Sequence, residues 1–537
     1  MSDLSSVLSG TFAQRLSLLT SPSLGDVLAR GLRGIEKESL RVAPDGSLAM
    51  TPHPRGLGSA LTHPSLTTDY SEALIELVTS AEPDPALTLA RLDELHRFAY
   101  SQLGDEVLWN CSMPGTLPED DDIPIAQYGT SNIGRLKHVY RRGLALRYGR
   151  TMQCIAGIHY NYSLSEEAWR VLHAAEPSSA TTVDFQSERY FALLRNFRRT
   201  SWLLMYLFGA SPALHRPFLR GRPHALESFD AETLYRPYAT SLRMSDLGYS
   251  NTTAQAALCP DYDTLSGYLD ALARAVSEPY APYEAIGTHR DGEWVQINTN
   301  ILQIENEFYS TIRPKRVTHS GERPLHALAS RGVQYVEVRC LDIDPFEPRG
   351  ISLETARFLD AYLLVCALDD SPPLPSTAYA EANANFSRVT LEGRKPGLLL
   401  TRDGRDISLQ DWAAQLLTQI ELAAKALDEL AGTDEHLRAV AAQRVKLADP
   451  ETTPSARVLR TMRERGQSFV AFGLAQSEAH AAYFRAHPLG AEEAQEAAAL
   501  AAASLEEQAL LEDRDAPDSF DAFITAFRSY TLERFSV

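Results

Sequence analysis

The chain has 537 residues, of which 44% are hydrophobic and 23% are charged, so it can bury a large core as a globular protein. Its net charge of -19 argues against a nucleic acid as the main partner and against a polybasic membrane anchor. The five cysteines are widely spaced without a CxxC pair, which favours free thiols in a reducing cytosol over a disulfide framework or a zinc site.

The sequence contains no recognisable segment for export or for membrane insertion. Residues 1–20 lack a basic region followed by a long apolar run, the pattern of a secretory signal. The longest apolar stretches, such as 358–368 and 497–503, are too short to cross a bilayer. We therefore expect a cytoplasmic protein with no membrane and no nucleic-acid partner.

The first acidic cluster lies in a predicted strand. Residues 5–30 have a helical pattern, and residues 31–42 are expected to form a strand. Glu36 and Glu38 are two residues apart, so they share one face of that strand with the apolar Leu40. Inward-facing carboxylates are ligands for a hard divalent cation such as Mg²⁺ or Mn²⁺, and a solvated sheet edge is the alternative interpretation.

The second acidic cluster is Asp69, Glu72 and Glu76 in TTDYSEALIEL. Helical spacing would place the three carboxylates along one stripe, where like charges repel and call for a compensating cation. Asp69 and Glu72 also fit a capping box at the start of a helix. Capping does not explain Glu76, which lies beyond the first turn. We therefore predict a helix here, with Glu72 as its cap.

Further polar residues recur on one face of predicted strands. Helices are expected over the ranges 82–103, 135–148 and 185–209, and strands over 153–163, 294–300 and 334–341. The strand at 153–163 has Gln153, His159 and Asn161 on one face, and the last strand has Glu337 and Arg339. Each residue alone fits a structural hydrogen bond or ion pair. Their recurrence in three segments predicts a sheet that lines a polar cavity suited to Mg²⁺ and phosphate.

Two arginines outside these strands are candidates for contacts to phosphoryl oxygens. Arg141 lies on the predicted basic helix, and Arg243 lies in YATSLRMSDLGY. Solvated helix charges are the alternative interpretation. The chain has no GxGxxG, Walker, GxSxG or HExxH motif, so metal ions and arginines would have to hold any nucleotide phosphates.

The composition changes near residue 405. Residues 1–405 predict an α+β fold around a polar cavity. Residues 406–537 are rich in Ala, Leu and Glu, with helical patterns over the ranges 408–431, 435–447, 454–465 and 476–512. We expect this helical C-terminal region to brace the first region and to contribute little chemistry.

Long motifs within residues 28–465 closely resemble glutamate-cysteine ligase of the proteobacterial type. They are GIEKESLRV, GSALTHPSLTTDYSEALIE, AQYGTSNIGRLKHVYRRGL, YLFGASPA, PYATSLRMSDLGY, QINTNILQIENEFYSTIRPKR, YVEVRCLDIDPF and LEGRKPGL. The resemblance implies a fold similar to glutamine synthetase, in which a curved, mainly antiparallel sheet forms a cavity and helices lie outside.

The resemblance also implies an activity. It is the ATP-dependent joining of the γ-carboxylate of L-glutamate to the amino group of L-cysteine through γ-glutamyl phosphate, the first step of glutathione synthesis. ATP is then a cosubstrate that acts with Mg²⁺, with Mn²⁺ as the alternative, and the protein is expected to be a monomer. The rival functions are a carboxylate-amine ligase with another amine acceptor and a Mg²⁺-dependent phosphohydrolase, which could use the same residues.

Site residues follow from the resemblance position by position. The positions that match the family's metal ligands are Glu36, Glu38, Asp69, Glu76, His159 and Glu337. The arginines expected near the glutamyl and phosphoryl groups are Arg243, Arg339 and Arg141. The positions that match the cysteine pocket are Tyr140, Leu144, Gln153, Tyr249 and Tyr309.

Overall fold

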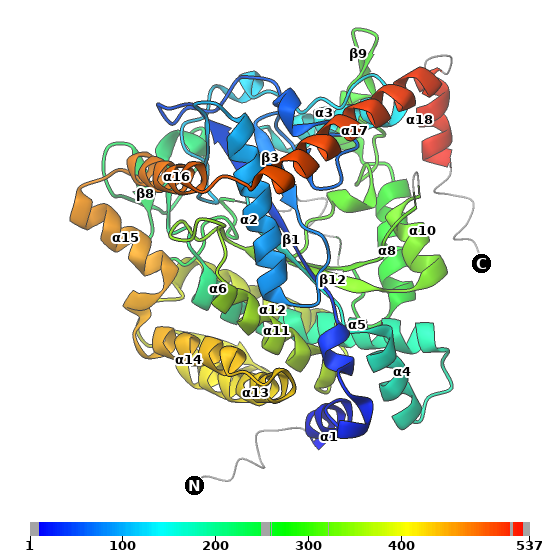
Figure 1. Cartoon of the computed structure of the whole chain (residues 1–537), viewed down its shortest axis with the longest axis vertical. Coiled ribbons are helices and arrows are strands. Elements are labelled where there is room, and N and C mark those ends of the chain that lie inside the picture. Colours follow the sequence, from blue (N-terminus) through cyan, green and yellow to red (C-terminus); the bar gives the residue numbers. More distant parts are fainter. Residues whose placement is uncertain (1–9, 249–257, 259, 320–321, 516–518, 530–537) are drawn as a thin grey trace.

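The structure is a computed structural model that describes residues 10–248, 258, 260–319, 322–515 and 519–529. At its centre, seven strands of the described chain form one sheet in the order β11-β12-β5-β1-β3-β2, with β4 paired to β1 (Figure 1). Every neighbouring pair is antiparallel, which confirms the predicted α+β class. The strands are β1 Arg33–Val42, β2 Leu66–Thr68, β3 Leu74–Val78, β4 Val107–Leu108, β5 Ile158–Tyr162, β11 Ile312–Lys315 and β12 Tyr335–Leu341.

Residue alternation gives this sheet one apolar and one acidic face. On β1, Ile35 lies in the main hydrophobic core, whereas its neighbour Glu36 and then Glu38 lie on the opposite face. On β12, Val336 and Val338 belong to the same core. The carboxylates therefore share one face of the sheet, on which the core residues Leu40 and Leu74 lie two positions farther along the same strand pair.

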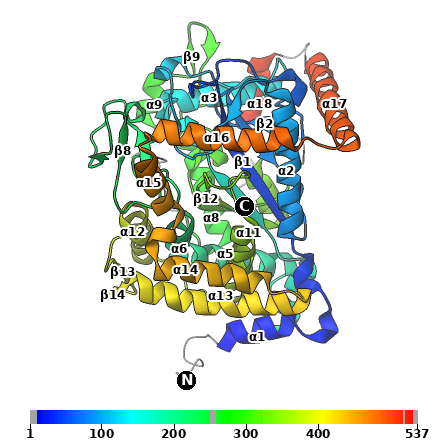
Figure 2. The ribbon, with the colours of Figure 1, turned by 60° about the vertical axis from the view of Figure 1, so that its left-hand side comes forward.

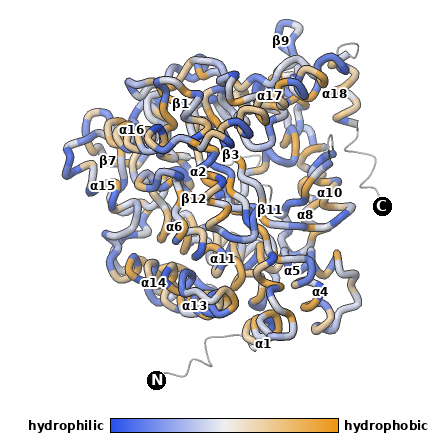
Figure 3. Tube along the Cα trace, in the orientation of Figure 1, coloured by the Kyte–Doolittle hydropathy of each residue, from blue (hydrophilic) through white to orange (hydrophobic). Residues whose placement is uncertain are grey.

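Helices cover the apolar face of the sheet. They are α2 Pro85–Gln102, α5 Thr182–Thr200, α6 Trp202–Phe208 and α11 Leu353–Leu368. Buried polar contacts tie one of these helices to the strands, because Asp360 of α11 accepts hydrogen bonds from Arg33 Nε at 2.9 Å and from the Tyr160 hydroxyl at 2.8 Å. Figure 3 shows hydrophobic residues around β12 and α11 and hydrophilic residues in many outer loops.

The remaining elements of the first region surround this two-layer centre. The helices are α1 Gly10–Leu19, α3 Asn132–Tyr148, α4 Glu166–Ala175, α8 Leu265–Ser277, α9 Ala281–Ile286, α10 Pro324–Arg331 and α12 Ser376–Glu392. Three small sheets are formed by β6 Ala213–His215 with β7 Glu227–Ser228 and β8 Thr233–Tyr235, by β9 His289–Arg290 with β10 Glu293–Trp294, and by β13 Leu399–Arg402 with β14 Arg405–Ser408. No helix of the described chain has both the length and the apolar character needed to span a membrane.

The C-terminal region is helical, as predicted. Its helices are α13 Leu409–Ala431, α14 Glu435–Ala448, α15 Pro454–Arg465, α16 Phe469–Ala486, α17 Ala491–Asp515 and α18 Phe520–Ser529. Helices α13 and α14 pack on α11, and α16 packs on α2 (Figure 2). Helices α17 and α18 then return to the same end of the molecule as α3 (Figure 1).

The helix predicted around Asp69, Glu72 and Glu76 is wrong. Asp69 follows β2, Glu72 lies in the turn, and Glu76 is in β3. The segment Leu74–Val78 alternates in side-chain direction and pairs with both β1 and β2, and this pairing prevails over the helical spacing. Glu72 is therefore not a helix cap. Its carboxylate accepts the backbone N–H of His53 at 2.9 Å and that of Gln127 at 2.7 Å.

Other predicted elements are shorter than expected. The strand predicted at 153–163 is restricted to β5, and Gln153 lies in a 3-10 turn, so it does not share a strand face with His159. Of the strand predicted at 294–300, only Trp294 lies in a strand, as the second residue of β10. The helix predicted at 185–209 is interrupted at Ser201, which ends α5 and precedes α6. The helical pattern at 5–30 becomes α1 followed by two 3-10 turns over the described part of that range.

Candidate functional site

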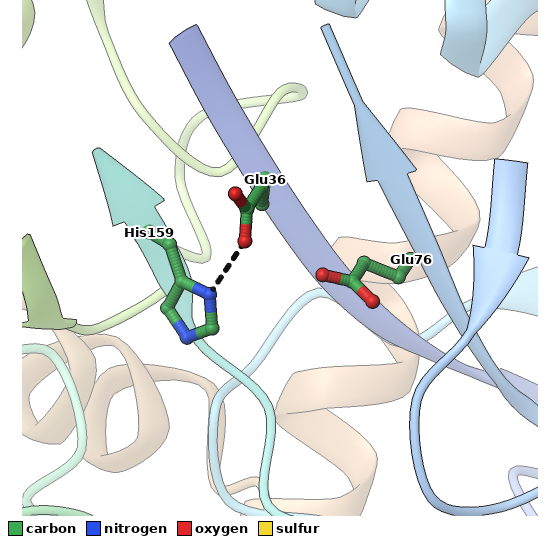
Figure 4. Close-up of side chains that lie close together, drawn as sticks. All are labelled: Glu36, Glu76 and His159. Atoms are coloured by element: carbon green, nitrogen blue, oxygen red, sulfur yellow. Dashed lines mark hydrogen bonds and ion pairs between the residues drawn. The ribbon is translucent and has the colours of Figure 1, made fainter. Parts of the chain in front are cut away.

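Three metal-ligating side chains meet on the acidic face of the sheet. Glu36 of β1, Glu76 of β3 and His159 of β5 each offer one ligand atom, and these atoms lie within 4.8 Å of one another (Figure 4). His159 Nδ1 lies 3.1 Å from Glu36 Oε2. The antiparallel register places Glu36 opposite His159 on one side, while β3 supplies Glu76 on the other. Strand pairing alone thus assembles the cluster.

An amide oxygen next to this cluster has no hydrogen-bond partner. The Asn161 amide donates to Glu36 Oε1 at 2.9 Å, and within the described residues its Oδ1 is buried without a partner. A buried acceptor without a donor costs free energy unless a cation or water contacts it. Asn161 was expected to share a face with His159, and on β5 it does.

Two further predicted carboxylates flank the cluster. Glu38 Oε1 lies 3.7 Å from His159 Nε2, and Glu38 Oε2 accepts the Gly157 N–H at 2.8 Å. Asp69 lies at the end of β2 and lines the same cavity as Glu38. These positions bring the two acidic segments of the sequence together at one site.

The accumulated negative charge changes the acidity of these groups. Burial, together with the charges of Glu36 and Asp69, raises the pKa of Glu76 well above its usual range. Burial also raises the pKa of Glu38. Several carboxylates that are held close together out of water are stable as anions only when a cation compensates them. The site is therefore built to receive positive charge.

Glu337 lies between two cations at the β11-β12 side of the sheet. Its Oε1 lies 3.3 Å from Lys315 Nζ, and its Oε2 lies 3.1 Å from Arg339 Nη1. Burial alone would raise the pKa of Glu337, but the charges of Lys315 and Arg339 hold it well below its usual range. Arg339 Nη1 also lies 3.4 Å from His159 Nδ1. Glu337 and Arg339 are thus continuous with the three-residue cluster.

Arg243 is completely buried behind Arg339. Its guanidinium donates to the carbonyl oxygens of Arg339 at 3.0 Å and Leu341 at 3.2 Å, where the β12-β5 register shifts. Gly157 allows this approach, because a Cβ at residue 157 would lie 2.0 Å from Arg243 Nη2. Arg243 also lies 3.7 Å from Asp342. Two of the three arginines predicted to bind phosphate, Arg243 and Arg339, are therefore neighbours.

A cavity of about 120 Å³ opens beside the acidic face. Glu38, Asp69 and Arg339 are part of its lining. The lining also includes the predicted residues Tyr140, Arg141, Leu144, Gln153 and Tyr309. Tyr249, the fifth residue predicted for the cysteine pocket, lies outside the described residues.

Arg141 has a specific structural contact within this arrangement. Its Nε donates to the carbonyl oxygen of Asp69, and its guanidinium lies 4.6 Å from the centre of the Tyr128 ring. Arg141 therefore connects α3 to the turn that carries Asp69. A guanidinium at this position joins the cavity wall to the acidic face.

Arg313 is a cavity residue to which the sequence interpretation gave no role. It lies on β11, and one of its nitrogens donates to the carbonyl oxygens of Asn306 and Phe308. Among the described residues, no carboxylate lies within ion-pair distance of this guanidinium. Burial lowers the pKa of Arg313, and the positive charge of Arg339 lowers it further. The run RPKR in the sequence was a signal, but only the pairing of β11 with β12 brings Arg313 to the site.

A buried ion pair forms the back of the cavity and was also missed. Glu307 lines the cavity, and its Oε1 lies 3.0 Å from Arg147 Nη1. Glu307 also accepts the Tyr148 hydroxyl and the Gln303 N–H. The partners come from α3 and from a turn about 160 positions later, so no local pattern in the sequence reports this contact.

Known proteins match this chain over most of its length. The family model described as glutamate-cysteine ligase matches residues 16–389. The chain is 62% identical over 525 residues to the glutamate-cysteine ligase of Azotobacter vinelandii, covering 97% of this chain and 99% of that protein. It is 60% identical over 525 residues to that of Pseudomonas paraeruginosa, covering 98% of this chain and 99% of that protein.

Two solved structures are similar to the whole fold. The structure of glutamate-cysteine ligase from Francisella tularensis in complex with AMP superposes with a TM-score of 0.87 at 38% identity, covering 93% of this chain and 98% of that chain. A bifunctional glutathione synthetase from Pasteurella multocida superposes with a TM-score of 0.69 at 25% identity, covering 88% of this chain and 55% of that chain. The chain therefore belongs to the glutamate-cysteine ligase family.

Proposed function

We propose that the acidic face and its cavity catalyse the ATP-dependent joining of the γ-carboxylate of L-glutamate to the amino group of L-cysteine. This is the first step of glutathione synthesis, and the family supports it. The observation that carries the proposal is the cavity that Glu38, Asp69, Arg313 and Arg339 line together. Carboxylates for a cation and guanidinium groups for substrate anions meet there.

The donor set of the acidic face fits Mg²⁺ or Mn²⁺. Glu36, Glu76 and His159 would hold such an ion, and Asn161 Oδ1, which has no partner among the described residues, is a fourth donor beside them. We propose Glu38, Asp69 and Glu337 as further ligands, because they border the same face. A bound divalent ion would neutralise the phosphates of ATP and position them.

The chemistry requires two successive substitutions. In the first, a γ-carboxylate oxygen of glutamate bonds to the terminal phosphorus of ATP, and the bond to ADP breaks to give γ-glutamyl phosphate. In the second, the cysteine nitrogen bonds to the acyl carbon of γ-glutamyl phosphate, the bond from that carbon to the phosphate oxygen breaks, and inorganic phosphate leaves with loss of a proton from the nitrogen. We propose that Arg339 and Arg243 stabilise the charge that develops on the phosphoryl oxygens, since Arg339 lines the cavity and the buried Arg243 is held behind it by the Arg339 carbonyl oxygen.

We propose that the cavity binds the amino-acid acceptor. Its lining combines apolar and aromatic side chains with a few charged groups, as sites for small molecules do. Tyr140, Leu144 and Tyr309 give it a partly apolar wall for a side chain, and Arg313 is placed to pair with the acceptor's α-carboxylate. The predicted role of Gln153 is supported by its place in the lining.

One assay distinguishes this function from its rivals. ADP release is measured with ATP alone, with ATP and glutamate, and with ATP, glutamate and either L-cysteine or each of a panel of other amines. We expect turnover to require glutamate and to be highest with cysteine. Turnover with another amine but not with cysteine would indicate a different carboxylate-amine ligase. Turnover without either amino acid would indicate a phosphohydrolase.

We further propose a cytoplasmic monomer with two regions. The four cysteines of the described residues are free and buried, which supports a reducing compartment. The family match ends at residue 389, which supports a catalytic region over 1–405 and a helical region over 406–537. Light scattering at working concentration tests the monomer, and a mass twice that of the 59.3 kDa chain would contradict it.

A further inference from the structure

The last long helix of the chain contacts the start of α3. Glu512 Oε1 accepts the backbone N–H of Thr130 at 2.8 Å, and Asp515 Oδ2 accepts that of Asn132 at 2.9 Å. Asn132 is the first residue of α3, where backbone N–H groups lack partners within the helix and the helix dipole is positive. Two carboxylates of α17 thus supply hydrogen-bond acceptors and negative charge to the N-terminus of α3.

The final helix covers the outer side of α3. Phe520 and Ile524 of α18 form a small hydrophobic cluster with Leu136 and Val139 of α3 and with Ile297. This cluster is separate from the main core. The side of α3 that does not face the cavity therefore owes much of its burial to α18.

Helix α17 also holds the segment that precedes β2. Ser504 Oγ accepts the Ser59 N–H at 2.9 Å, and the Ser504 carbonyl oxygen accepts the Thr62 hydroxyl at 2.5 Å. Gly58 permits this close approach, because its φ is +85° and a Cβ there would lie 2.4 Å from Ser504 Oγ. Helix α17 therefore bridges two segments, one leading to Asp69 and the other starting α3.

We infer that α17 and α18 position α3 against the amino-acid cavity and so set the shape of that cavity. Tyr140, Arg141 and Leu144 of α3 line the cavity. Tyr140 also packs against the hydrophobic cluster that α18 forms, and Arg141 donates to the Asp69 carbonyl oxygen. A displacement of α3 moves all three residues, while the acidic face on β1, β3 and β5 keeps its own strand pairing. Glu512, Asp515 and Ile524 are positioning residues, and the inference rests on the proposed function for the identity of the ligand.

The test compares matched double variants of the full-length protein. Glu512→Ala/Asp515→Ala removes both contacts to α3, and Glu507→Ala/Asp513→Ala removes two exposed carboxylates of the same helix. We expect the first double variant to raise the KM for L-cysteine by about fivefold or more, with the KM for ATP changed by less than about twofold. The control should match the wild type.

Hydrogen exchange gives a readout that does not depend on activity. We expect amides of α3 to exchange faster in Glu512→Ala/Asp515→Ala, with amides of β1 and β5 unchanged. Ile524→Ala, at a fully buried position, should have the same effect, whereas Leu510→Ala, whose side chain is 70% exposed, should not. Ile524→Ala keeps the inference testable if the charge variant fails to fold.

The outcomes separate this inference from the proposed function. Unchanged exchange in α3 with an unchanged cysteine KM would overturn the inference. A loss of kcat with all KM values unchanged would also overturn it, because the helices would then have a purely structural role. If the wild type shows no turnover with glutamate and cysteine, the proposed function fails. Hydrogen exchange of the α3 amides then still decides whether α17 and α18 hold α3 in place.

Discussion

Glu38 of β1 and Glu76 of β3 lie directly opposite each other in the antiparallel register. Like charges in this position destabilise a sheet, and here both side chains are on a face that already holds Glu36. The fold tolerates this repulsion at the point where we propose that a cation binds. Stability and function are therefore opposed at this pair of residues.

Glu76→Gln should separate the two effects. Without divalent cations, it should raise the free energy of unfolding by about 0.5 to 1 kcal/mol, because it removes one of several close charges. With Mg²⁺ it should lower turnover by orders of magnitude, because a metal ligand is lost. Urea unfolding in the presence of EDTA and an ADP-release assay measure the two quantities. Asp105→Asn, at an exposed position, is the control, and normal turnover of Glu76→Gln would remove Glu76 from the metal site.

Arg313→Met should weaken binding of the acceptor. A charge-assisted hydrogen bond to a carboxylate contributes about 1.5 to 3 kcal/mol, so the KM for L-cysteine should rise by about tenfold to a hundredfold. The KM for ATP should change little. Arg316→Met is a matched control, since Arg316 donates to the Arg331 carbonyl oxygen instead. A larger effect on the KM for glutamate than on that for cysteine would assign Arg313 to the other substrate.

Gly157→Ala should impair catalysis while the protein stays folded. The added methyl group would lie 2.0 Å from Arg243 Nη2, so the guanidinium has to move away from the Arg339 carbonyl oxygen. We expect kcat to fall by about tenfold or more and stability to fall by about 1 to 3 kcal/mol. Gly34→Ala on the same sheet has only ordinary contacts, at 3.6 Å or more, and should be mild. Equal kcat values for the two variants would refute the role of Arg243.

His53 should make the protein sensitive to mild acid. Burial, with the nearby charge of Arg41, lowers its pKa to about 4, and neither ring nitrogen has a hydrogen-bond partner within the described residues. Between that value and the ordinary pKa of about 6.5, the unfolded chain binds a proton that the folded chain does not, so stability falls as the pH falls through this window.

His53→Leu should therefore flatten the pH dependence. The wild type should lose up to about 3 kcal/mol of unfolding free energy between pH 6.5 and pH 4 through this residue, and the variant should not. Urea unfolding at several pH values measures the difference, with the exposed His224→Leu as the control. Parallel stability curves for His53→Leu and the wild type would contradict the assignment.

The alternation of polar and apolar residues along a single segment explains which parts of the fold were predictable. Glu36 and Glu38 were expected on one strand face because their spacing and their apolar neighbours agree over a whole strand. For Asp69 and Glu76, the i and i+7 spacing of a helix also fits two short strands joined by a turn. Only the pairing of β3 with β1 decides between these structures, and pairing is not a local property of the sequence.

The site was predictable where side chains from separate strands point to the same face of the sheet. His159 and Arg339 were expected beside Glu36 for this reason, and their contacts confirm that they are neighbours. Their roles, and those of the other site residues, stay predictions. Arg313 and the Arg147-Glu307 pair were missed because each depends on contacts between distant segments. The contacts of α17 and α18 with α3 could not be predicted for the same reason.

The buried cysteines have a consequence for an enzyme whose substrate is itself a thiol. Burial raises the pKa of Cys111 and Cys154, and it raises the pKa of Cys340 and Cys366 to about 12. Thiol-disulfide exchange needs an accessible thiolate, and none of these four side chains supplies one near neutral pH. These thiols should therefore not form mixed disulfides with cysteine or its oxidised dimer, so fluctuations in the redox state of the substrate pool leave them unmodified.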